Sequence, residues 1–412
     1  MVELAFDVVI AGAGPAGSTT AQRLARAGFR VALVDAQRFP RFKPCGEFMS
    51  PEVLPLLRDL GVFDDVQRVG AREVRGMLLH AHGQRVHGRF VDVGRALAPF
   101  DHGWAVRREV FDEVLLRAAL RTGGVEFFEG FRAFELLRAA DGTVEGLRAK
   151  NAGGEVLELL GSFTIGADGV RSMVASELGV RQPTKWLDKL ALTTRYSDVP
   201  WGERAEVHFL EHGFFACAPV DGGLVSLNLV LDAAEFARTG LPRDEALEHW
   251  LELTPALGQR IRAGRRVDPV RGIGSMAMTT RAQTFDGAAL VGDASGYVDP
   301  VTGEGIFFAL KGAEALATAL TQALHARRRD AAALAPYLEV RSREIAPRAA
   351  LSTLLQRGLK HPSLVRAAFG VLARRPRLVD TLVSITGDYV PLSELRRPSV
   401  WWRALTERGG VA

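Results

Sequence analysis

The chain has few cysteines and few lysines. Among its 412 residues only Cys45 and Cys217 carry thiols, which is too few for a disulfide framework or a structural zinc site built on cysteine. A reducing, cytoplasmic location is therefore expected. Only six of the 52 basic residues are lysines, and the net charge of +4 is small and evenly spread. This balance argues against a nucleic-acid-binding protein.

Long apolar runs are also missing. No stretch reaches the roughly 18 residues needed to cross a bilayer. The apolar residues 8–14 are interrupted by glycines and preceded by acids, unlike a signal peptide. A composition that is 47% hydrophobic and 24% charged is typical of a globular protein, and the length predicts two or three domains.

The N-terminal segment has the pattern of strand, glycine-rich turn, helix and strand. Residues 6–11 form a nearly continuous apolar run, as expected of a buried parallel strand. A helix is predicted up to residue 27 and a second buried strand over 30–34, ending at Asp35. The turn between them fits G-x-G-x-x-G and consists of Gly12, Ala13, Gly14, Pro15, Ala16 and Gly17.

Each glycine in this turn has a physical reason. Gly12 permits the tight turn, Gly14 lets the backbone approach a pyrophosphate, and Gly17 lets helix and strand pack closely. The phosphate then meets free N–H groups at the helix N-terminus, together with Pro15 and Ala16. Asp35 would accept hydrogen bonds from ribose hydroxyls and repel a 2′-phosphate, so FAD or NAD is expected rather than NADP.

Two later segments also end a predicted strand in an acidic residue. Asp168 and Gly169 follow residues 162–167, and Gly292 and Asp293 follow residues 287–291. In an open parallel sheet, ligands bind at this edge. With the N-terminal motif, these segments resemble the p-hydroxybenzoate hydroxylase-like flavoprotein superfamily over residues 1 to about 325.

The resemblance implies an α/β fold with a doubly wound, Rossmann-like FAD-binding domain. It places Asp293 on the FAD ribityl chain, Asp168 near the pyrophosphate, and Arg108 beside the FAD phosphates; an exposed helix arginine is the alternative for Arg108. We expect the FAD-binding domain to comprise residues 1–75, 100–180 and 280–330. A substrate domain is expected over 76–99 and 181–279, and a C-terminal helical region over 331–412.

A second glycine-rich turn precedes a long predicted helix that reaches about residue 324. Gly303 and Gly305 open this helix after Pro300, and its free N–H groups would face the flavin C2 carbonyl and N1 and stabilise negative charge there. These three residues are predicted to form the flavin environment, with no acid or base assigned. Glu304 and Ile306 are placed with the cofactor-binding residues; a helix cap without ligand is the alternative.

The residues 39–51 and 299–306 are similar to those of geranylgeranyl reductases and of related polyketide-tailoring oxidoreductases and halogenases. This similarity places Arg41, Cys45 and Gly46 beside FAD, although for Cys45 a structural role is preferred over a redox thiol. The tryptophan pair and the lysine of the halogenases are missing, since Arg75 occupies the relevant segment and residues 44–149 contain no lysine. Halogenation is therefore not expected. The prenyl reductase signature is also altered, at residues 214–219.

The pattern of the residues between Asp168 and Gly292 predicts an antiparallel sheet that covers the flavin. Its strands are expected at 189–197, 206–210, 214–220, 224–231 and 270–278. An apolar inner face would hold a hydrophobic or aromatic substrate, although core packing is the alternative for each residue. The predicted substrate-binding residues are Phe209, Phe214, Phe215 and Cys217, with Met276 and Met278 beside them.

No metal site is predicted. His80 and His82 alternate on one expected strand face, but no third ligand has suitable spacing. The amphipathic segments 347–360, 362–373 and 377–385 either contact a membrane surface or, as we prefer, cap the substrate cavity or a partner subunit. A monomer or a homodimer is compatible with the sequence.

The resemblance implies an FAD-dependent oxidoreductase, and a monooxygenase is favoured. NADPH or NADH would reduce FAD, oxygen would add at C4a, and the hydroperoxide would oxygenate an aromatic or polyketide-like molecule. One alternative is a reductase of isoprenoid double bonds, and another is a non-catalytic FAD-binding or electron-transfer protein. No second G-x-G-x-x-G motif is present, so a nicotinamide nucleotide would bind transiently or an electron-donor protein would act.

Overall fold

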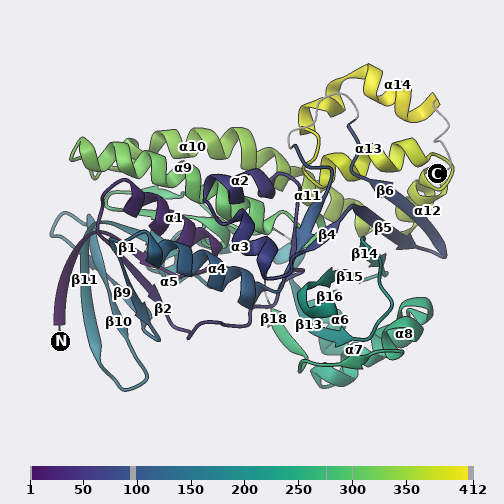
Figure 1. Ribbon diagram of the computed structural model, residues 1–412, viewed down its shortest axis with the longest axis horizontal. Coiled ribbons are helices and arrows are strands. Elements are labelled where there is room, and N and C mark those ends of the chain that lie inside the picture. Colours follow the sequence, from purple (N-terminus) through teal and green to yellow (C-terminus); the bar gives the residue numbers. More distant parts are fainter. Residues whose placement is uncertain (1, 93–98, 275, 299, 407–412) are drawn as a thin grey trace.

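The computed structural model describes residues 2–92, 99–274, 276–298 and 300–406. It is a mixed α/β fold with two eight-stranded sheets, named the first and the second sheet below, and a helical C-terminal region. Figure 1 shows α9 and α10 lying along the first sheet, whereas α12, α13 and α14 gather at the other end of the molecule. The predicted fold class is confirmed, and the domain boundaries remain a prediction.

The first sheet is mainly parallel and has the strand order β20-β21-β11-β1-β2-β8, with β10 and then β9 added to β11. Because β1 pairs in parallel with β2 and β11, and β11 with β21, their carboxyl ends meet at one edge. The strands are β1 Val2–Ala11, β2 Val31–Asp35, β8 Val125–Glu129, β9 Arg132–Arg138, β10 Val144–Lys150, β11 Val156–Gly166, β20 Thr284–Phe285 and β21 Ala288–Leu290.

Both faces of the first sheet are covered. Along β1, Val8 and Ile10 pack in one apolar core with α1 and α9, whereas Val9 and Ala11 pack in another with β9, β10 and α5. This two-sided burial explains the continuous apolar run of the sequence. The helices around this sheet are α1 Pro15–Arg26, α4 Arg108–Arg121, α5 Met173–Glu177, α9 Gly305–His325 and α10 Ala335–Val340.

The second sheet has the order β17-β13-β16-β15-β14-β5-β6, with β18 also on β13. Four of the five strands predicted there are confirmed within two residues at either end. The pairing is antiparallel except between β5 and β14, which run parallel. The strands are β5 Gly76–Ala81, β6 Gln84–Arg89, β13 Lys189–Ser197, β14 Ala205–Phe209, β15 Gly213–Val220, β16 Leu224–Asp232, β17 Arg265–Arg266 and β18 Arg271–Gly274.

The prediction of a fifth strand over residues 270–278 is wrong in length. Strand β18 ends at Gly274, and β19 (Met278–Thr280) pairs with β12 (Arg181–Pro183) in a separate sheet. The chain changes partners because the backbone N–H of Met276 donates to Lys189, whereas that of Met278 donates to Tyr297. The apolar run therefore serves two sheets in succession.

Helices cover the outer face of the second sheet, and the other face points toward the first sheet. The covering helices are α6 Ala233–Thr239, α7 Arg243–Glu252 and α8 Pro255–Arg262. Between the two large sheets lie α2 Val53–Asp59, α3 Phe63–Arg68 and a three-stranded sheet of β3 Phe48–Met49, β4 Arg72–Val74 and β7 Gly103–Ala105.

The C-terminal region is helical, as predicted. Helices α11 Ala346–Leu359, α12 Pro362–Leu372, α13 Pro376–Thr386 and α14 Pro398–Thr406 follow one another, and Phe369 and Val383 pack against β5 and β6 in one apolar core. Leu354, Leu364 and Trp402 remain exposed. Within the described residues, none of the helices combines the length and hydropathy needed for a bilayer span.

Candidate functional site

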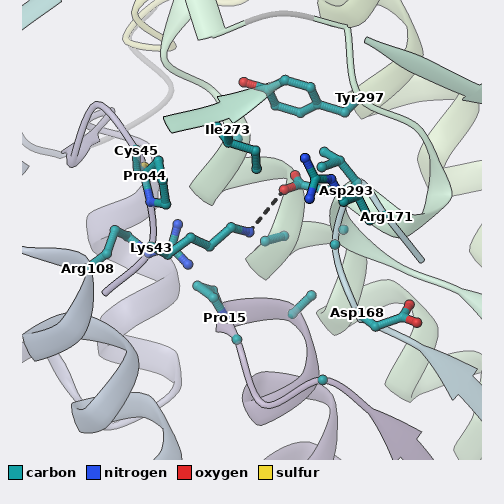
Figure 2. A pocket seen from close by; sticks show the side chains of 18 of the residues that line it. Pro15, Lys43, Pro44, Cys45, Arg108, Asp168, Arg171, Ile273, Asp293 and Tyr297 are labelled. Atoms are coloured by element: carbon teal, nitrogen blue, oxygen red, sulfur yellow. Dashed lines mark hydrogen bonds and ion pairs between the residues drawn. The ribbon is translucent and has the colours of Figure 1, made fainter. Parts of the chain in front are cut away.

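A cavity of about 500 Å³ lies between the carboxyl edge of the first sheet and the inner face of the second. Figure 2 shows side chains from both sides pointing into it. The structure brings most of the predicted site residues to its lining, and their binding roles remain predictions. The predicted residues that line the cavity are Gly12, Gly14, Pro15, Ala16, Asp35, Arg41, Cys45, Gly46, Arg108, Asp168, Gly169, Phe214, Gly292, Asp293, Pro300, Gly303, Gly305 and Ile306.

The first glycine-rich turn has the geometry that a diphosphate requires. Gly12 has a φ of +99°, and a Cβ there would lie 2.4 Å from the carbonyl oxygen of Ala167. Gly17 does not line the cavity, because it packs so closely that a Cβ would lie 1.8 Å from the carbonyl oxygen of Gly12. At Gly14 a Cβ would meet only the Arg41 side chain, at 3.3 Å, so the backbone there is open to the cavity.

Asp35 holds this turn together. Its Oδ2 accepts a 2.9 Å hydrogen bond from the N–H of Ala13, and its Oδ1 accepts one of 2.8 Å from Gln37. Each carboxylate oxygen has a second lone pair, so both oxygens can still accept from ribose hydroxyls. The predicted position of this acid at the end of β2 is confirmed.

Two arginines share one buried carboxylate at the edge of the cavity. Asp112 accepts hydrogen bonds of 2.8 and 2.9 Å from Arg108, and its Oδ2 lies 3.2 Å from Nη1 of Arg41. Arg108 is buried, so it is not the exposed helix arginine of the alternative interpretation. Burial alone would lower the pKa of Arg108, but the Asp112 carboxylate raises it. Nε of Arg41 also lies 3.7 Å from Oδ2 of Asp35, and each guanidinium group has five N–H donors, so both arginines retain donors for a phosphate.

Asp168 has one oxygen engaged and one available. Its Oδ2 accepts from the N–H groups of Met173 and Val174 at the start of α5, at 2.7 and 3.3 Å. Its Oδ1 is buried without a hydrogen-bond partner among the described residues. Burial raises the pKa of this carboxyl group. A cofactor hydroxyl that donates to Oδ1 would satisfy an acceptor that is costly to bury alone.

Lys43 lies in the lining but was missed by the sequence analysis. Its Nζ is 3.3 Å from Oδ2 of Asp293, as the dashed line in Figure 2 marks, and Arg171 lies on the other side of this carboxylate. Gly292, which precedes Asp293, has a φ of +61°, and a Cβ there would lie 2.9 Å from the Cβ of Ala16. The only sequence signal for Lys43 was its place in the 39–51 segment.

Helix α9 directs its first turn at the cavity. Gly303, with a φ of +72°, lies so close to Phe48 that a Cβ would be 3.0 Å from that ring. Glu304 does not line the cavity, so its placement with the cofactor-binding residues is corrected. Its carboxyl group is buried and bonds with Thr302 and Asp388 instead, because α9 turns this side chain toward the C-terminal region.

Three carboxyl groups surround one guanidinium group beside α9. Arg348 on α11 lies 2.6 Å from Glu52 and 3.1 Å from Asp388, whose carboxyl group also bonds with Glu304. Burial raises the pKa of Glu52 to about 7 and that of Asp388 well above its ordinary value. One cation cannot balance three buried carboxylates, so this cluster holds at least one proton near neutral pH.

The 39–51 segment, which lines part of the cavity, is held by a second buried ion cluster. Glu47 has a φ of +60° and is fully buried, where it bonds with Arg195 on β13. Arg195 also contacts Glu109 at 2.7 Å and Asp268 at 2.9 Å. This arginine therefore ties the 39–51 segment to the second sheet. No local sequence pattern pointed to it.

The predicted substrate wall is partly wrong. Phe214 lines the cavity, whereas Phe215 and Cys217 point to the outer face and pack with α7 and α8. Side chains alternate along a strand, so Phe215 and Cys217 share the face opposite Phe214. Phe209 lies outside the lining and packs on Phe214 and Phe369, with ring centroids 6.3 and 5.9 Å apart.

Other residues complete the wall. Met276 lines it, whereas Met278 does not. Thr193 and Asn228 form a polar pair in this otherwise apolar wall, joined by a 2.8 Å hydrogen bond. The wall from the second sheet and its neighbours consists of Ala191, Thr193, Phe214, Ala216, Asn228, Val230, Ile273, Met276 and Tyr297.

These features fit FAD. The open backbone at Gly14 and the guanidinium groups of Arg41 and Arg108 suit the diphosphate, and Asp35 suits the adenosine ribose. Oδ1 of Asp168, which has no hydrogen-bond partner in the described part of the chain, can accept from a cofactor hydroxyl. The residues at the start of α9 and the apolar wall enclose a space for a ring system.

Comparison with known proteins agrees with this geometry. The model of the FAD binding domain family matches residues 5–349. The chain is 30% identical to a menaquinone reductase of Mycobacterium tuberculosis over 337 residues, 75% of each chain. It is 28% identical over 315 residues to a tryptophan 2-halogenase of Chondromyces crocatus, covering 74% of this chain and only 59% of that relative.

A solved structure has the same fold. PqsL of Pseudomonas aeruginosa, described as a probable FAD-dependent monooxygenase, superposes with a TM-score of 0.71 at 23% identity, over 89% of this chain and 100% of that one. The match to the family model covers most of the chain, and the superfamily resemblance is confirmed. The chain belongs to the FAD binding domain family, within the p-hydroxybenzoate hydroxylase-like flavoprotein superfamily.

Proposed function

We propose that the protein is an FAD-dependent monooxygenase of a hydrophobic aromatic or polyketide-like small molecule. The observation that carries this proposal is one continuous cavity that joins the glycine-lined nucleotide end to an apolar wall containing Phe214, Ile273 and Met276. Bound FAD, once reduced by a hydride donor, supplies the chemistry of oxygen activation and transfer. The chain supplies binding, orientation and exclusion of water.

The residues of the cavity would have distinct tasks. The N–H groups at Gly305 and the following turn of α9 would stabilise negative charge on the flavin ring. Thr193 and Asn228 would orient a hydroxyl or carbonyl group of the substrate. The described lining contains no histidine, which favours a substrate that is itself electron-rich over one that must be deprotonated by the protein.

Halogenation is kept as an outcome to be tested because a tryptophan 2-halogenase is a relative. Oxygenation is favoured over it for a reason of geometry. Lys43, a lysine of the lining, is engaged by Asp293 on the cofactor side of the cavity, whereas a halogenating lysine would have to reach the substrate side.

Reduction of an isoprenoid double bond is the second candidate. The menaquinone reductase of M. tuberculosis supports it, since that relative is 30% identical over three quarters of both chains. Phe214 of the wall packs on Phe209, which packs on Phe369 of α12, so the C-terminal helices lie behind the apolar wall. An apolar tail would bind along this wall inside the cavity.

Electrons would come from NADPH or NADH bound transiently, or from a partner flavoprotein. The test is to reduce the FAD-loaded protein without oxygen, using each nucleotide or dithionite. Phenolic polyketides, indole and menaquinone are then added with and without bromide, and air is admitted. A product heavier by one oxygen atom supports the monooxygenase, two added hydrogens support the reductase, and an incorporated bromine supports the halogenase. FAD reduction without product would indicate the non-catalytic alternative.

A further inference from the structure

Two histidines meet on the outer face of the second sheet, away from the FAD cavity. Strands β5 and β14 run side by side in parallel, and their register pairs His80 with His208. His82 is not on this face, because β5 ends at Ala81 and His82 lies in the following turn with a φ of +49°. The expectation that His80 and His82 share a strand face is therefore wrong.

A carboxylate completes a three-residue cluster. The imidazole rings of His80 and His208 stack with centroids 4.0 Å apart and planes 7° apart. Oε2 of Glu206 lies 3.1 Å from Nε2 of His208 and 3.7 Å from Nε2 of His80. Glu206 and His208 are buried, and Nε2 of His80 is buried without a hydrogen-bond partner among the described residues.

These separations are near those of metal ligands, and a turn of one of the two stacked rings about its side-chain torsions would direct both Nε2 lone pairs at one ion. Tetrahedral zinc with bonds of about 2.0–2.1 Å places neighbouring ligand atoms about 3.4 Å apart, a value between the two distances from Glu206 to the histidines. All three ligand atoms lie within 4.8 Å of one another. We propose that His80, Glu206 and His208 bind a divalent transition-metal ion, Zn²⁺ being best suited to two imidazoles and one carboxylate.

The surroundings of the cluster restrict the choice of metal. Arg260 donates a 2.6 Å hydrogen bond to Oε2 of Glu206, so a metal would share this carboxylate with a guanidinium group. Hard cations such as Ca²⁺ and Mg²⁺ rely on several oxygen ligands and would bind poorly. A cation held chiefly by two imidazoles tolerates the arginine better.

The fourth coordination position is open to small ligands. Glu206 and Arg260 border a hollow of about 570 Å³ that is also lined by Arg85, Arg89 and Arg204. Water or a small anion from this hollow could complete the coordination. The ion would connect β5, from the first quarter of the chain, to β14 and so stabilise the folded form, because the unfolded chain does not bring the ligands together.

The experiment uses the FAD-loaded protein after removal of metal with a chelator. Zn²⁺ is titrated in competition with a chromophoric chelator, and Co²⁺ is added to follow ligand-field absorption. We expect one equivalent to bind and to raise the melting temperature. His80→Asn and His208→Asn should each weaken binding at least about 10-fold and remove the tetrahedral Co²⁺ spectrum. Arg260→Met should leave binding intact or tighten it.

The matched control is His87→Asn, which changes a neighbouring histidine on β6 whose Nε2 is also buried without a hydrogen-bond partner among the described residues. It should bind Zn²⁺ as the wild type does. Retained FAD content in each variant confirms that it has folded. The proposal is overturned if neither Zn²⁺ nor Co²⁺ binds stoichiometrically. It is also overturned if the His80 and His208 variants bind as tightly as the His87 variant.

Discussion

Lys43, in the loop between β2 and β3, pairs with Asp293, the two charged groups being 3.3 Å apart. The pair joins the 39–51 segment to the turn after β21, where superfamily resemblance places the ribityl chain of FAD. Asp293 could therefore act in FAD binding either through its ion pair with Lys43 or by accepting a hydrogen bond from the cofactor. Substitutions of Asp293 and of Lys43 distinguish these two roles.

We expect Asp293→Ala to weaken FAD binding at least about 10-fold, the equivalent of one lost hydrogen bond to a charged group. Lys43→Met should weaken it less, since Asp293 remains in place. Fluorescence titration of the apoprotein with FAD measures both, with the exposed Asp64→Ala as control. Equal losses in the Asp293 and Lys43 variants would mean that the ion pair itself, and not a hydrogen bond from FAD, is what matters.

Substitutions of Gly12 and Gly14 in the first glycine-rich turn should affect different properties, the first stability and the second FAD binding. Gly12→Ala places a side chain at a φ of +99° and against the Ala167 carbonyl, which should lower the free energy of unfolding of the apoprotein by roughly 1–3 kcal/mol or more. Gly14→Ala should change that stability by less than about 1 kcal/mol but weaken FAD binding. Denaturant unfolding and FAD titration measure the two effects separately, and an unchanged FAD affinity for Gly14→Ala would contradict the assigned diphosphate position.

Neighbouring phenylalanines on β15 allow a matched comparison. Phe215→Ala removes a ring from the core under α7 and α8 and should lower the free energy of unfolding by about 3–5 kcal/mol. Phe214→Ala enlarges the cavity and should destabilise the protein less, while it changes the dissociation constant of any ligand that perturbs the flavin absorbance. A ligand affinity that responds to Phe215 and not to Phe214 would show that the cavity wall is assigned to the wrong face.

The buried carboxyl cluster predicts a pH dependence of stability. The pKa of Glu52 is raised from 4.5 to about 7 in the folded protein, so the folded state holds this proton more tightly than the unfolded state. The free energy of unfolding should therefore fall as pH rises from about 4.5 to 7, by up to about 3 kcal/mol, and level off above.

Glu52→Gln should remove this part of the slope. Its stability relative to the wild type is expected to increase between pH 5 and pH 8, as measured by denaturant unfolding at both values. Glu3→Gln, at an exposed position, serves as the control. If the difference in free energy of unfolding between Glu52→Gln and the wild type is the same at both pH values, the pKa of Glu52 is not raised in the folded protein.

Local patterns predicted the elements well, and long-range contacts account for what they missed. The run before Gly12 and the acids at the carboxyl ends of β2, β11 and β21 were sufficient to place these residues at the cavity, because each signal depends on neighbours in the sequence. Alternation along β15 shows that Phe215 and Cys217 share a face, but which face meets the cavity depends on where α7 and α8 pack.

The clusters could not be found in this way. Glu304 and Asp388 meet because α9 and the C-terminal region are packed together, and His80 meets His208 because β5 pairs with β14. Arg195 forms ion pairs with acidic residues from three separate segments of the chain. Each of these contacts joins residues more than 70 positions apart, where spacing along the chain carries no information.

The parallel pairing of β5 with β14 also bears on how the protein can be cut and assembled. A fragment limited to residues 181–279 would leave one side of β14 without its backbone partners, and such an uncovered edge invites self-association. During synthesis, the hairpin of β5 and β6 must wait for more than a hundred further residues before its neighbour emerges. We therefore expect the second sheet to complete its pairing late in folding. We also expect that no single contiguous segment of the chain can be moved to another protein and still form this sheet.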